Sequence, residues 1–336
     1  MPAVQSAASI GPTLVVVPAV DHARLLAGRL RRSGRTVALM PDQWSAAASG
    51  VDVVVGARNA AWAPCRDLAA VVLVDEHDEG VYAESSPTWN ARDVLLERCR
   101  RADVPLLMVS PCPTLHAIEW RPVVRPPAAR ERAGWPIVDV IDRSDTEPWK
   151  RSLVTSELIG HLRDPERTVV CVSNTTGRAR VLACRSCREL VRCERCDAAV
   201  ALTDDGRLRC ARCDLQRPPV CANCGSSDFA NLRPGVTRLR EELEAAAGRA
   251  VARVTGADDD VVPDVGVYVG TEAVLHRVAA ADTVAFLDID RELLAPRYRA
   301  DEQAMALLVR AARLVGPRAR GGRLLLQTFM PRHRVI

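Results

Sequence analysis

The chain has 336 residues, enough for about two domains of ~100–200 residues each. Its composition, 48% hydrophobic and 26% charged, excludes a disordered tail, and no apolar run reaches the ~20 residues that a membrane span requires. The net charge of +4 is too small to argue for nucleic-acid binding. Residues 1–9 lack the basic and apolar segments of a secretory signal, so we expect a cytoplasmic protein without membrane contact.

Residues 1–120 are expected to form a first α/β lobe. Short, apolar and largely β-branched runs alternate there with helical spacing of apolar residues, which predicts a parallel sheet covered on both faces. The expected strands are Thr13–Val17, Val51–Val55, Ala69–Val74 and Leu106–Val109, and the expected helices are Asp21–Arg32 and Trp89–Arg101.

A proline-rich, charged stretch follows, and we assign residues 121–150 to a linker that includes a strand-like run at Ile137–Ile141. A second α/β pattern then predicts a second lobe over 151–336, interrupted by a cysteine-rich block at 184–224. Its expected helices are Ser152–His161, Thr237–Ala247 and Asp301–Leu314, and its expected strands are Thr168–Val172, Val251–Val254, Val265–Val269, Thr283–Asp288 and Arg323–Thr328.

The block holds eight of the twelve cysteines as four C-x-x-C pairs. A pair on a tight turn presents two thiolates to one metal ion, and two pairs complete a tetrahedral zinc site. The pairs therefore predict two zinc ions per chain in closed, structural four-cysteine sites. Disulfides suit small secreted domains, a redox pair would be single, and four evenly built pairs favour zinc over an iron–sulfur cluster. The pairs are Cys184/Cys187, Cys193/Cys196, Cys210/Cys213 and Cys221/Cys224.

Zinc would also explain how residues 184–224 fold, because their large apolar side chains are too few to offset the chain entropy. The block also carries arginines, which have two interpretations. They either contact DNA phosphates or offset the negative charge of the thiolates, and we favour the second. These arginines are Arg185, Arg188, Arg192, Arg195 and Arg212.

The apolar run that begins at Val71 ends in the acidic sequence Asp75-Glu76-His77-Asp78. An acidic pair at the carboxyl end of a parallel strand is where a nucleotide-driven motor holds Mg²⁺ and polarises water. A charged strand end is equally often a solvated turn. On these residues alone, both interpretations of Asp75 and Glu76 stay open.

Further motifs follow in a fixed order along both lobes. In the first lobe they are the run Val53–Pro64, the acidic run Asp75–Asp78, Tyr82, and Ala91-Arg92-Asp93-Val94. In the second they are the spacing of the four cysteine pairs, Gly235 before Glu241-Glu242-Leu243, Gly270-Thr271, and Gln327-Thr328 before Pro331. In order, spacing and the inserted cysteine block, essentially the whole chain resembles the PriA family of primosomal replication-restart helicases.

The resemblance implies two RecA-like parallel-sheet lobes with a two-zinc, four-cysteine-per-ion ribbon inserted in the second. It implies an ATP-dependent 3′–5′ DNA helicase of superfamily 2, using ATP and Mg²⁺ in the cytoplasm at the nucleoid. The implied partners are branched or single-stranded DNA, primosome proteins and single-strand-binding protein. It also implies a nested pairing of the cysteines, which the spacing alone does not select. One ion would bind Cys184, Cys187, Cys221 and Cys224, and the other Cys193, Cys196, Cys210 and Cys213.

The motor motifs depart from this family in several places. The phosphate-binding G-x-x-x-x-G-K-[ST] loop is absent, and Lys150, the single lysine, lies in a Pro-Trp context that does not suit this role. The D-E-E-H box reads Asp75–Asp78, the N-R-R-G motif reads 174–177 without its arginines, and the last motif keeps only Arg313. One arginine on the transferred phosphoryl group is worth ~10³–10⁵ in rate. We therefore expect no catalytic residues and no ATP hydrolysis, as in the degenerate actinobacterial members.

The family's N-terminal DNA-end-binding and winged-helix domains and its last small domain have no counterpart in these residues, which implies a fragment or a partial reading frame. We expect a PriA-like restart protein that binds DNA at stalled or branched forks and helps assemble the primosome without hydrolysing ATP. The alternatives are an active helicase whose phosphate loop lies upstream of Met1, and a zinc-dependent protein-interaction scaffold that does not contact DNA.

Overall fold

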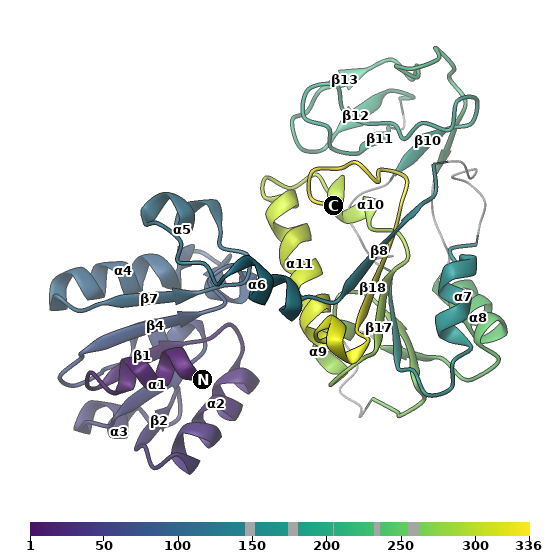
Figure 1. Ribbon diagram of the computed structural model, residues 1–336. Coiled ribbons are helices and arrows are strands. Elements are labelled where there is room, and N and C mark those ends of the chain that lie inside the picture. Colours follow the sequence, from purple (N-terminus) through teal and green to yellow (C-terminus); the bar gives the residue numbers. More distant parts are fainter. Residues whose placement is uncertain (145–151, 174–180, 204, 232–235, 255–261) are drawn as a thin grey trace. The chain divides into compact units, whose positions relative to one another are not determined.

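The computed structural model describes residues 1–144, 152–173, 181–203, 205–231, 236–254 and 262–336. It divides the chain into two compact units, Met1–Val124 and Arg125–Ile336, which Figure 1 shows in sequence colours. Lys150, Gly235 and the motif at 174–177 lie outside the described residues. Among the helices in the described ranges, none is long and apolar enough to cross a membrane.

The first unit is built on a five-stranded, fully parallel sheet in the order β2-β3-β1-β4-β7. The strands are β1 (Thr13–Val16), β2 (Val37–Leu39), β3 (Val53–Gly56), β4 (Ala70–Val74) and β7 (Leu106–Val109). The helices are α1 (Pro2–Ala8), α2 (Val20–Arg32), α3 (Trp44–Ser49), α4 (Ala91–Ala102) and α5 (Leu115–Trp120), with 3₁₀ turns η1 (Arg58–Trp62) and η2 (Glu79–Val81).

Apolar side chains cover both faces of this sheet. Because successive strand residues point to opposite faces, Leu14 and Val16 enter one core cluster while Val15 enters the other. Both clusters draw on valines of β3 and β4, which explains why these strands read as continuous apolar runs. The carboxyl ends of the strands therefore share one edge, where the acidic run from Asp75 begins.

The second unit is built on a six-stranded parallel sheet in the order β15-β16-β9-β17-β18-β8. The strands are β8 (Ile137–Asp142), β9 (Val169–Val172), β15 (Ala252–Val254), β16 (Val267–Gly270), β17 (Thr283–Phe286) and β18 (Arg323–Thr328). The helices are α6 (Ala128–Gly134), α7 (Ser156–Leu162), α8 (Val236–Ala247), α9 (Val274–Arg277), α10 (Asp290–Leu293) and α11 (Ala300–Val315), with the 3₁₀ turn η3 (Arg318–Arg320).

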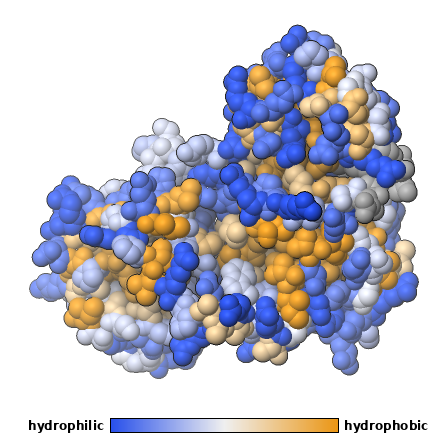
Figure 2. Space-filling view, turned by 45° about the horizontal axis from the view of Figure 1, so that its top comes forward, coloured by the Kyte–Doolittle hydropathy of each residue, from blue (hydrophilic) through white to orange (hydrophobic). Residues whose placement is uncertain are grey.

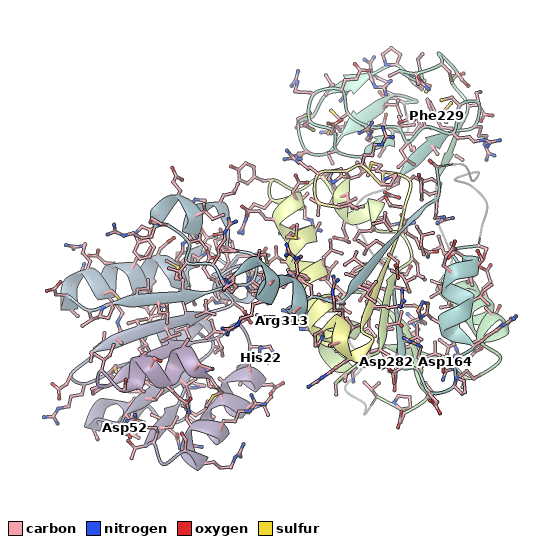
Figure 3. All side chains as sticks on the ribbon, viewed as in Figure 1. His22, Asp52, Asp164, Phe229, Asp282 and Arg313 are labelled. Atoms are coloured by element: carbon pink, nitrogen blue, oxygen red, sulfur yellow. The ribbon has the colours of Figure 1, made fainter. Side chains whose placement is uncertain are left out.

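A ribbon module, defined here as the described residues of 181–231, extends from this unit between β9 and α8 (Figure 1). Its strands β10 (Leu182–Cys184) and β14 (Phe229–Asn231) pair antiparallel, and Phe229 is labelled in Figure 3. The strands β11 (Val200–Leu202), β12 (Leu208–Cys210) and β13 (Gln216–Arg217) form a small antiparallel sheet. Hydrophilic residues dominate the visible face of the module in Figure 2.

The structure differs from the sequence-based expectations at several elements. The helix predicted from Ser152 begins at Ser156, after its N-cap residue Thr155. The strand β8 lies inside the predicted linker 121–150, yet it pairs with β18 as the edge of the second sheet. The three-residue edge strand β2 was not predicted at all. The predicted helix at Trp89 starts two residues later, because Trp89–Asn90 form β6, paired with β5 (Tyr82–Ala83), and the Asn90 side chain caps α4.

Candidate functional site

Each cysteine pair of the ribbon module occupies the same backbone turn. The residue after the second cysteine is left-handed, with φ of 56–74°. The N–H of this left-handed residue donates to the carbonyl of the first cysteine at 2.9–3.0 Å. The N–H of the first cysteine donates to the carbonyl of the residue that follows the left-handed one, at 2.8–3.0 Å. These left-handed residues are Arg188, Asp197, Asp214 and Gly225. Aspartate and glycine tolerate this conformation well, so their position after three of the pairs is a turn signal that the sequence analysis did not use.

The turns bring the sulfurs together in two groups of four that could each hold a metal ion. Within each group all four Sγ atoms lie within 4.8 Å of one another, and the closest distances are 3.5–3.6 Å. A tetrahedral site with Zn–S bonds of about 2.3 Å separates its sulfurs by about 3.8 Å, whereas a disulfide requires about 2.0 Å. The donor set therefore suits a tetrahedral thiolate-bound metal. The groups are Cys184, Cys187, Cys221, Cys224 and Cys193, Cys196, Cys210, Cys213.

Strand pairing explains why the two groups are nested along the chain. Cys184 pairs with Phe229 across β10 and β14, which brings the first and last cysteine turns together. Val200 pairs with Cys210 across β11 and β12, which folds the two middle turns onto each other. The resemblance had implied this grouping, and the short strands provide the physical reason for it.

The module is attached to the second lobe by a small apolar cluster and a backbone hydrogen bond. Ala183, Leu190 and Ala199 pack with Leu294 at the end of α10. The N–H of Ala199 donates to the carbonyl of Leu294 at 2.9 Å. Beyond this contact, the core of the module is made of few residues, several of which are the cysteines themselves.

Three of the five arginines named from the sequence lie beside carboxylates or carbonyls. Arg185 lies 3.4 Å from Asp228, and Arg192 lies 3.7 Å from both Glu189 and Asp197. The Nη2 of Arg212 donates to the carbonyl of Tyr298. These exposed pairs contribute little stability. They favour the interpretation in which the arginines balance local negative charge over the one in which they form a phosphate-binding row.

The acidic strand end places Asp75 and Glu76 side by side but gives Glu76 internal partners. Asp75 adopts a left-handed backbone with φ 55°, and its N–H donates to the carbonyl of Val109 on β7. Glu76 is 2% exposed. Its Oε1 accepts from the Arg92 guanidinium at 3.1 Å and from the Thr114 hydroxyl at 2.5 Å, and its Oε2 accepts from the Thr114 N–H at 3.1 Å. Both carboxylate oxygens of Glu76 are thus used to join α4 and α5 to the strand end.

The neighbouring His77 is also held by an internal contact. Its Nδ1 lies 2.8 Å from the hydroxyl of Ser110, which follows β7. The acidic run and the Ser110 to Thr114 segment therefore form one hydrogen-bonded unit. The sequence analysis had not predicted this contact between the two segments.

Other matched residues of the second unit have structural roles. A Cβ at Gly270 would lie 2.1 Å from the carbonyl oxygen of Val254, so only glycine fits between β15 and β16. The buried Gln327 donates to the carbonyl of Leu153 at 2.9 Å. Arg313 lies exposed on α11 (Figure 3). Packing around the sheet thus explains the residue types at Gly270 and Gln327.

A buried carboxylate that the sequence analysis missed lies after β17. Asp290 is 1% exposed, and burial, with the nearby charge of Asp288, raises its pKa to about 7. Its carboxylate accepts hydrogen bonds from the Thr328 hydroxyl at 2.5 Å and from the Phe329 N–H at 2.8 Å. These bonds and the charge of Arg143 lower the pKa of Asp290 and so partly oppose the effect of burial. Asp290 stands in the charged run 288–292, and nothing in that run distinguishes a buried aspartate from an exposed one.

We expect Asp290→Asn to change how the stability of the second unit depends on pH. Between about pH 4 and 7, folded Asp290 keeps a proton that the unfolded chain releases, so the free energy of unfolding falls as pH rises. The slope is about 1.4 kcal/mol per pH unit for one proton. Asparagine cannot titrate, so this contribution should be missing from the variant. Between pH 5 and pH 7 the free energy of unfolding, measured with urea, should fall less steeply in the variant than in the wild type, by roughly 1.4 kcal/mol per pH unit. Loss of metal at low pH would affect the wild type and the variant alike. Parallel plots of unfolding free energy against pH for the two proteins would contradict a raised pKa at Asp290.

Taken together, these features define a protein of two α/β lobes with parallel sheets and an inserted ribbon that carries two candidate metal centres. No protein-family model matches the chain. The curated proteins nevertheless show that the chain is related to the PriA family of replication restart proteins over most of its length.

The PriA of Bacillus subtilis is 26% identical over 361 aligned positions, which cover 95% of this chain and 44% of that protein. The PriA of Thermotoga maritima is 26% identical, covering 88% of this chain and 43% of the relative, and that of Treponema pallidum is 27% identical, covering 84% and 46%. The chain thus spans less than half the length of these relatives. Among solved structures, the DExH-box NTPase HrpB of E. coli aligns with a TM-score of 0.44 and 13% identity, over 95% of this chain and 36% of the other.

Proposed function

We propose that the chain is a PriA-like restart protein that binds branched or single-stranded DNA at stalled forks. It helps assemble the primosome in the cytoplasm, at the nucleoid, without hydrolysing ATP. The observation that carries this proposal is the relationship to PriA proteins over 95% of the chain. The relatives are named replication restart proteins, and the paired lobes with the inserted ribbon are what the resemblance implied.

The absence of hydrolysis is proposed from the chemistry of the strand end. The sequence has no phosphate-binding glycine-rich loop with its lysine. In a motor, the acidic pair must be available to Mg²⁺ and to the attacking water. Here the carboxylate of Glu76 accepts three hydrogen bonds from Arg92 and Thr114, so its oxygens are committed to the protein. Glu76 is therefore assigned a structural role, which removes one carboxylate of the acidic pair from motor chemistry.

We further propose that the two four-cysteine groups hold zinc, with one ion per group. Four thiolates leave no open coordination position, so the ions would be structural and would fix the ribbon in 184–224. The ribbon would then serve as a rigid surface for primosome proteins. The charge-paired arginines support this protein-contact role over direct phosphate contact.

One experiment tests the DNA and ATP parts of the proposal together. Fluorescence anisotropy with a labelled fork should show binding at low salt that weakens steeply as salt increases, because phosphate contacts release counterions. ATP turnover in the same samples should stay at background with and without the fork. The contrary results are distinct. Fork-stimulated turnover that is lost in Asp75→Asn would establish an active helicase, and no fork binding at low salt would leave the protein-interaction scaffold.

A further inference from the structure

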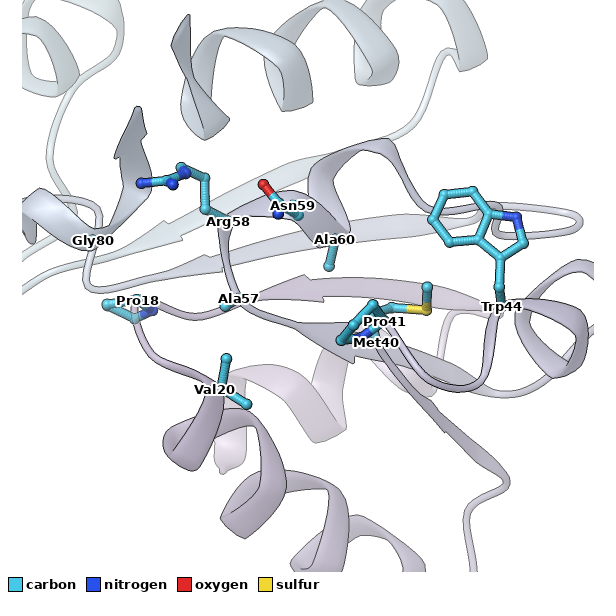
Figure 4. Close-up of a pocket in the computed structure, with 10 residues that line it drawn as sticks. All are labelled: Pro18, Val20, Met40, Pro41, Trp44, Ala57, Arg58, Asn59, Ala60 and Gly80. Atoms are coloured by element: carbon cyan, nitrogen blue, oxygen red, sulfur yellow. The ribbon is translucent and has the colours of Figure 1, made fainter. Parts of the chain in front are cut away.

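The first unit contains a pocket of about 440 Å³ at the carboxyl edge of its sheet (Figure 4). It is lined by residues after β1, after β2 and after β3, and by Gly80 of η2. In the strand order, β2 and β3 lie on one side of β1, and β4 lies on its other side. The chain runs from β1 to β2 in one direction and from β3 to β4 in the opposite direction. A crevice at such a switch point is where open α/β sheets bind ligands. Its volume is within the range of small-molecule sites.

The lining of the pocket is mainly apolar, with a flat aromatic wall. The lining residues without a charged or amide side chain are Pro18, Val20, Met40, Pro41, Trp44, Ala57, Ala60 and Gly80. Trp44, the first residue of the short helix α3, is 50% exposed and lines this cavity. Gly80 packs closely against Pro18 in this lining, since a Cβ there would lie 2.6 Å from the carbonyl oxygen of Pro18. The pocket thus offers a slot with an exposed ring face.

The polar groups of the pocket are Arg58 and Asn59, which follow β3. In Figure 4, Arg58 and Gly80 lie at one end of the pocket and Trp44 at the other. The Nη1 of Arg58 donates to the carbonyl of Tyr82 at 2.6 Å, which fixes the guanidinium. Its Nε is buried without a hydrogen-bond partner, and in the described part of the chain no carboxylate pairs with the guanidinium. The positive charge of Arg58 is therefore not balanced by a neighbouring carboxylate, which favours an anion beside it.

The exposed aromatic surface continues past Arg58. Its guanidinium carbon lies 5.8 Å from the ring centre of Trp89, and Trp89 packs edge-on against Trp62 at 5.6 Å. Trp62 is itself 59% exposed. Aromatic side chains interleaved with an arginine are the usual platform for unpaired bases, whose ring faces stack and whose phosphates are anionic.

We propose that this pocket takes a single unpaired nucleobase of single-stranded DNA. The base stacks on Trp44, the Asn59 amide contacts its edge, and Arg58 contacts the adjoining phosphate. The inference rests on the proposed DNA-binding function and adds a base-binding site to it. An apolar side chain of a protein partner would fit the cavity but would leave Arg58 without an anion.

The test uses the full, zinc-loaded chain and two oligomers of equal length and charge. One is a single-stranded oligothymidylate, and the other is its abasic sugar–phosphate analogue. Anisotropy at fixed salt should show tighter binding of the base-bearing strand. Trp44→Ala should weaken that binding by on the order of 10-fold to 100-fold, and leave the abasic strand unaffected. Trp44→Phe should restore most of the loss. Trp120→Ala, which removes an indole that is 42% exposed and outside the pocket, is the matched control and should change neither affinity.

Each other outcome overturns the inference. Unchanged oligothymidylate binding in Trp44→Ala would exclude a base in the pocket and leave a protein side chain as the occupant. Equal weakening for both oligomers would show that Trp44 only supports the fold near phosphate contacts. If the wild-type chain binds the fork and Trp44→Ala binds oligothymidylate as tightly as the wild type does, only this inference fails. If it binds no DNA at low salt, the proposed function fails with it.

Discussion

Removing zinc from the full chain is expected to unfold residues 184–224 while the first unit stays folded. The apolar core of the ribbon module consists of few residues, among them Cys193 and Cys210. A core of this size does not offset chain entropy, and structural zinc supplies about 10–16 kcal/mol in small zinc modules at neutral pH. Hydrogen exchange should show loss of protection at the N–H groups of the four cysteine turns after chelation. Retained protection after complete metal removal would contradict the prediction.

Because the cysteines form two separate groups, replacing one cysteine is expected to remove only the zinc ion of its own group. Cys210→Ser removes a buried ligand from the inner group, so elemental analysis should fall from two equivalents of zinc to one. Exchange protection should be lost first in β11, β12 and β13, because one inner turn precedes β11 and the other joins β12 to β13. Cys65→Ser, a cysteine of the first unit outside both groups, is the control and should keep both equivalents. Loss of both ions in Cys210→Ser would mean that the two groups do not fold independently.

The strands with continuous burial could be predicted from sequence, and so could the edge strands β7 and β15. The edge strand β2 was missed, and the strand-like run of β8 was assigned to a linker. β1, β3 and β4 are buried along their full length or nearly so, and an unbroken apolar run is the signature of such a strand. β8 alternates between half-buried and exposed residues, because one of its faces is open to solvent. The segment before it is rich in proline, so the sequence analysis assigned both to a linker. β2 has only three residues, too few for any periodicity to show.

The candidate site shows the same division between local and long-range information. Four C-x-x-C pairs specify their turns locally, since each hydrogen bond closes within five residues. Which turns share a metal depends on strand pairing across the module, and spacing alone left this open. The role of Glu76 depends on Arg92 and Thr114, which are 16 and 38 residues away in the chain. No pattern around Asp75 reports such partners, so motor chemistry and a structural contact looked alike in the sequence.

Arg92→Ala is expected to lower the free energy of unfolding of the first unit by about 3–5 kcal/mol. The side chains of Arg92 and Glu76 are 11% and 1% exposed, so the substitution leaves a buried carboxylate without its counter-charge. Thr114 alone would then satisfy Glu76, and Thr114 also caps α5 through the Ala117 N–H. Urea unfolding monitored on the first unit measures the loss. Arg100→Ala on the same helix, in an exposed pair with Glu97, is the control and should leave stability nearly unchanged.

A double substitution separates the lost charge pair from lost packing around Arg92. Glu76→Gln keeps an acceptor for Thr114 but carries no charge, so Arg92→Ala combined with Glu76→Gln should recover a substantial part of the stability lost in Arg92→Ala. If Glu76 instead acted in phosphoryl transfer, Glu76→Gln would abolish an ATP turnover that the wild-type chain possesses. A double variant no more stable than Arg92→Ala would show that the arginine stem, rather than its charge, holds α4 to the strand end.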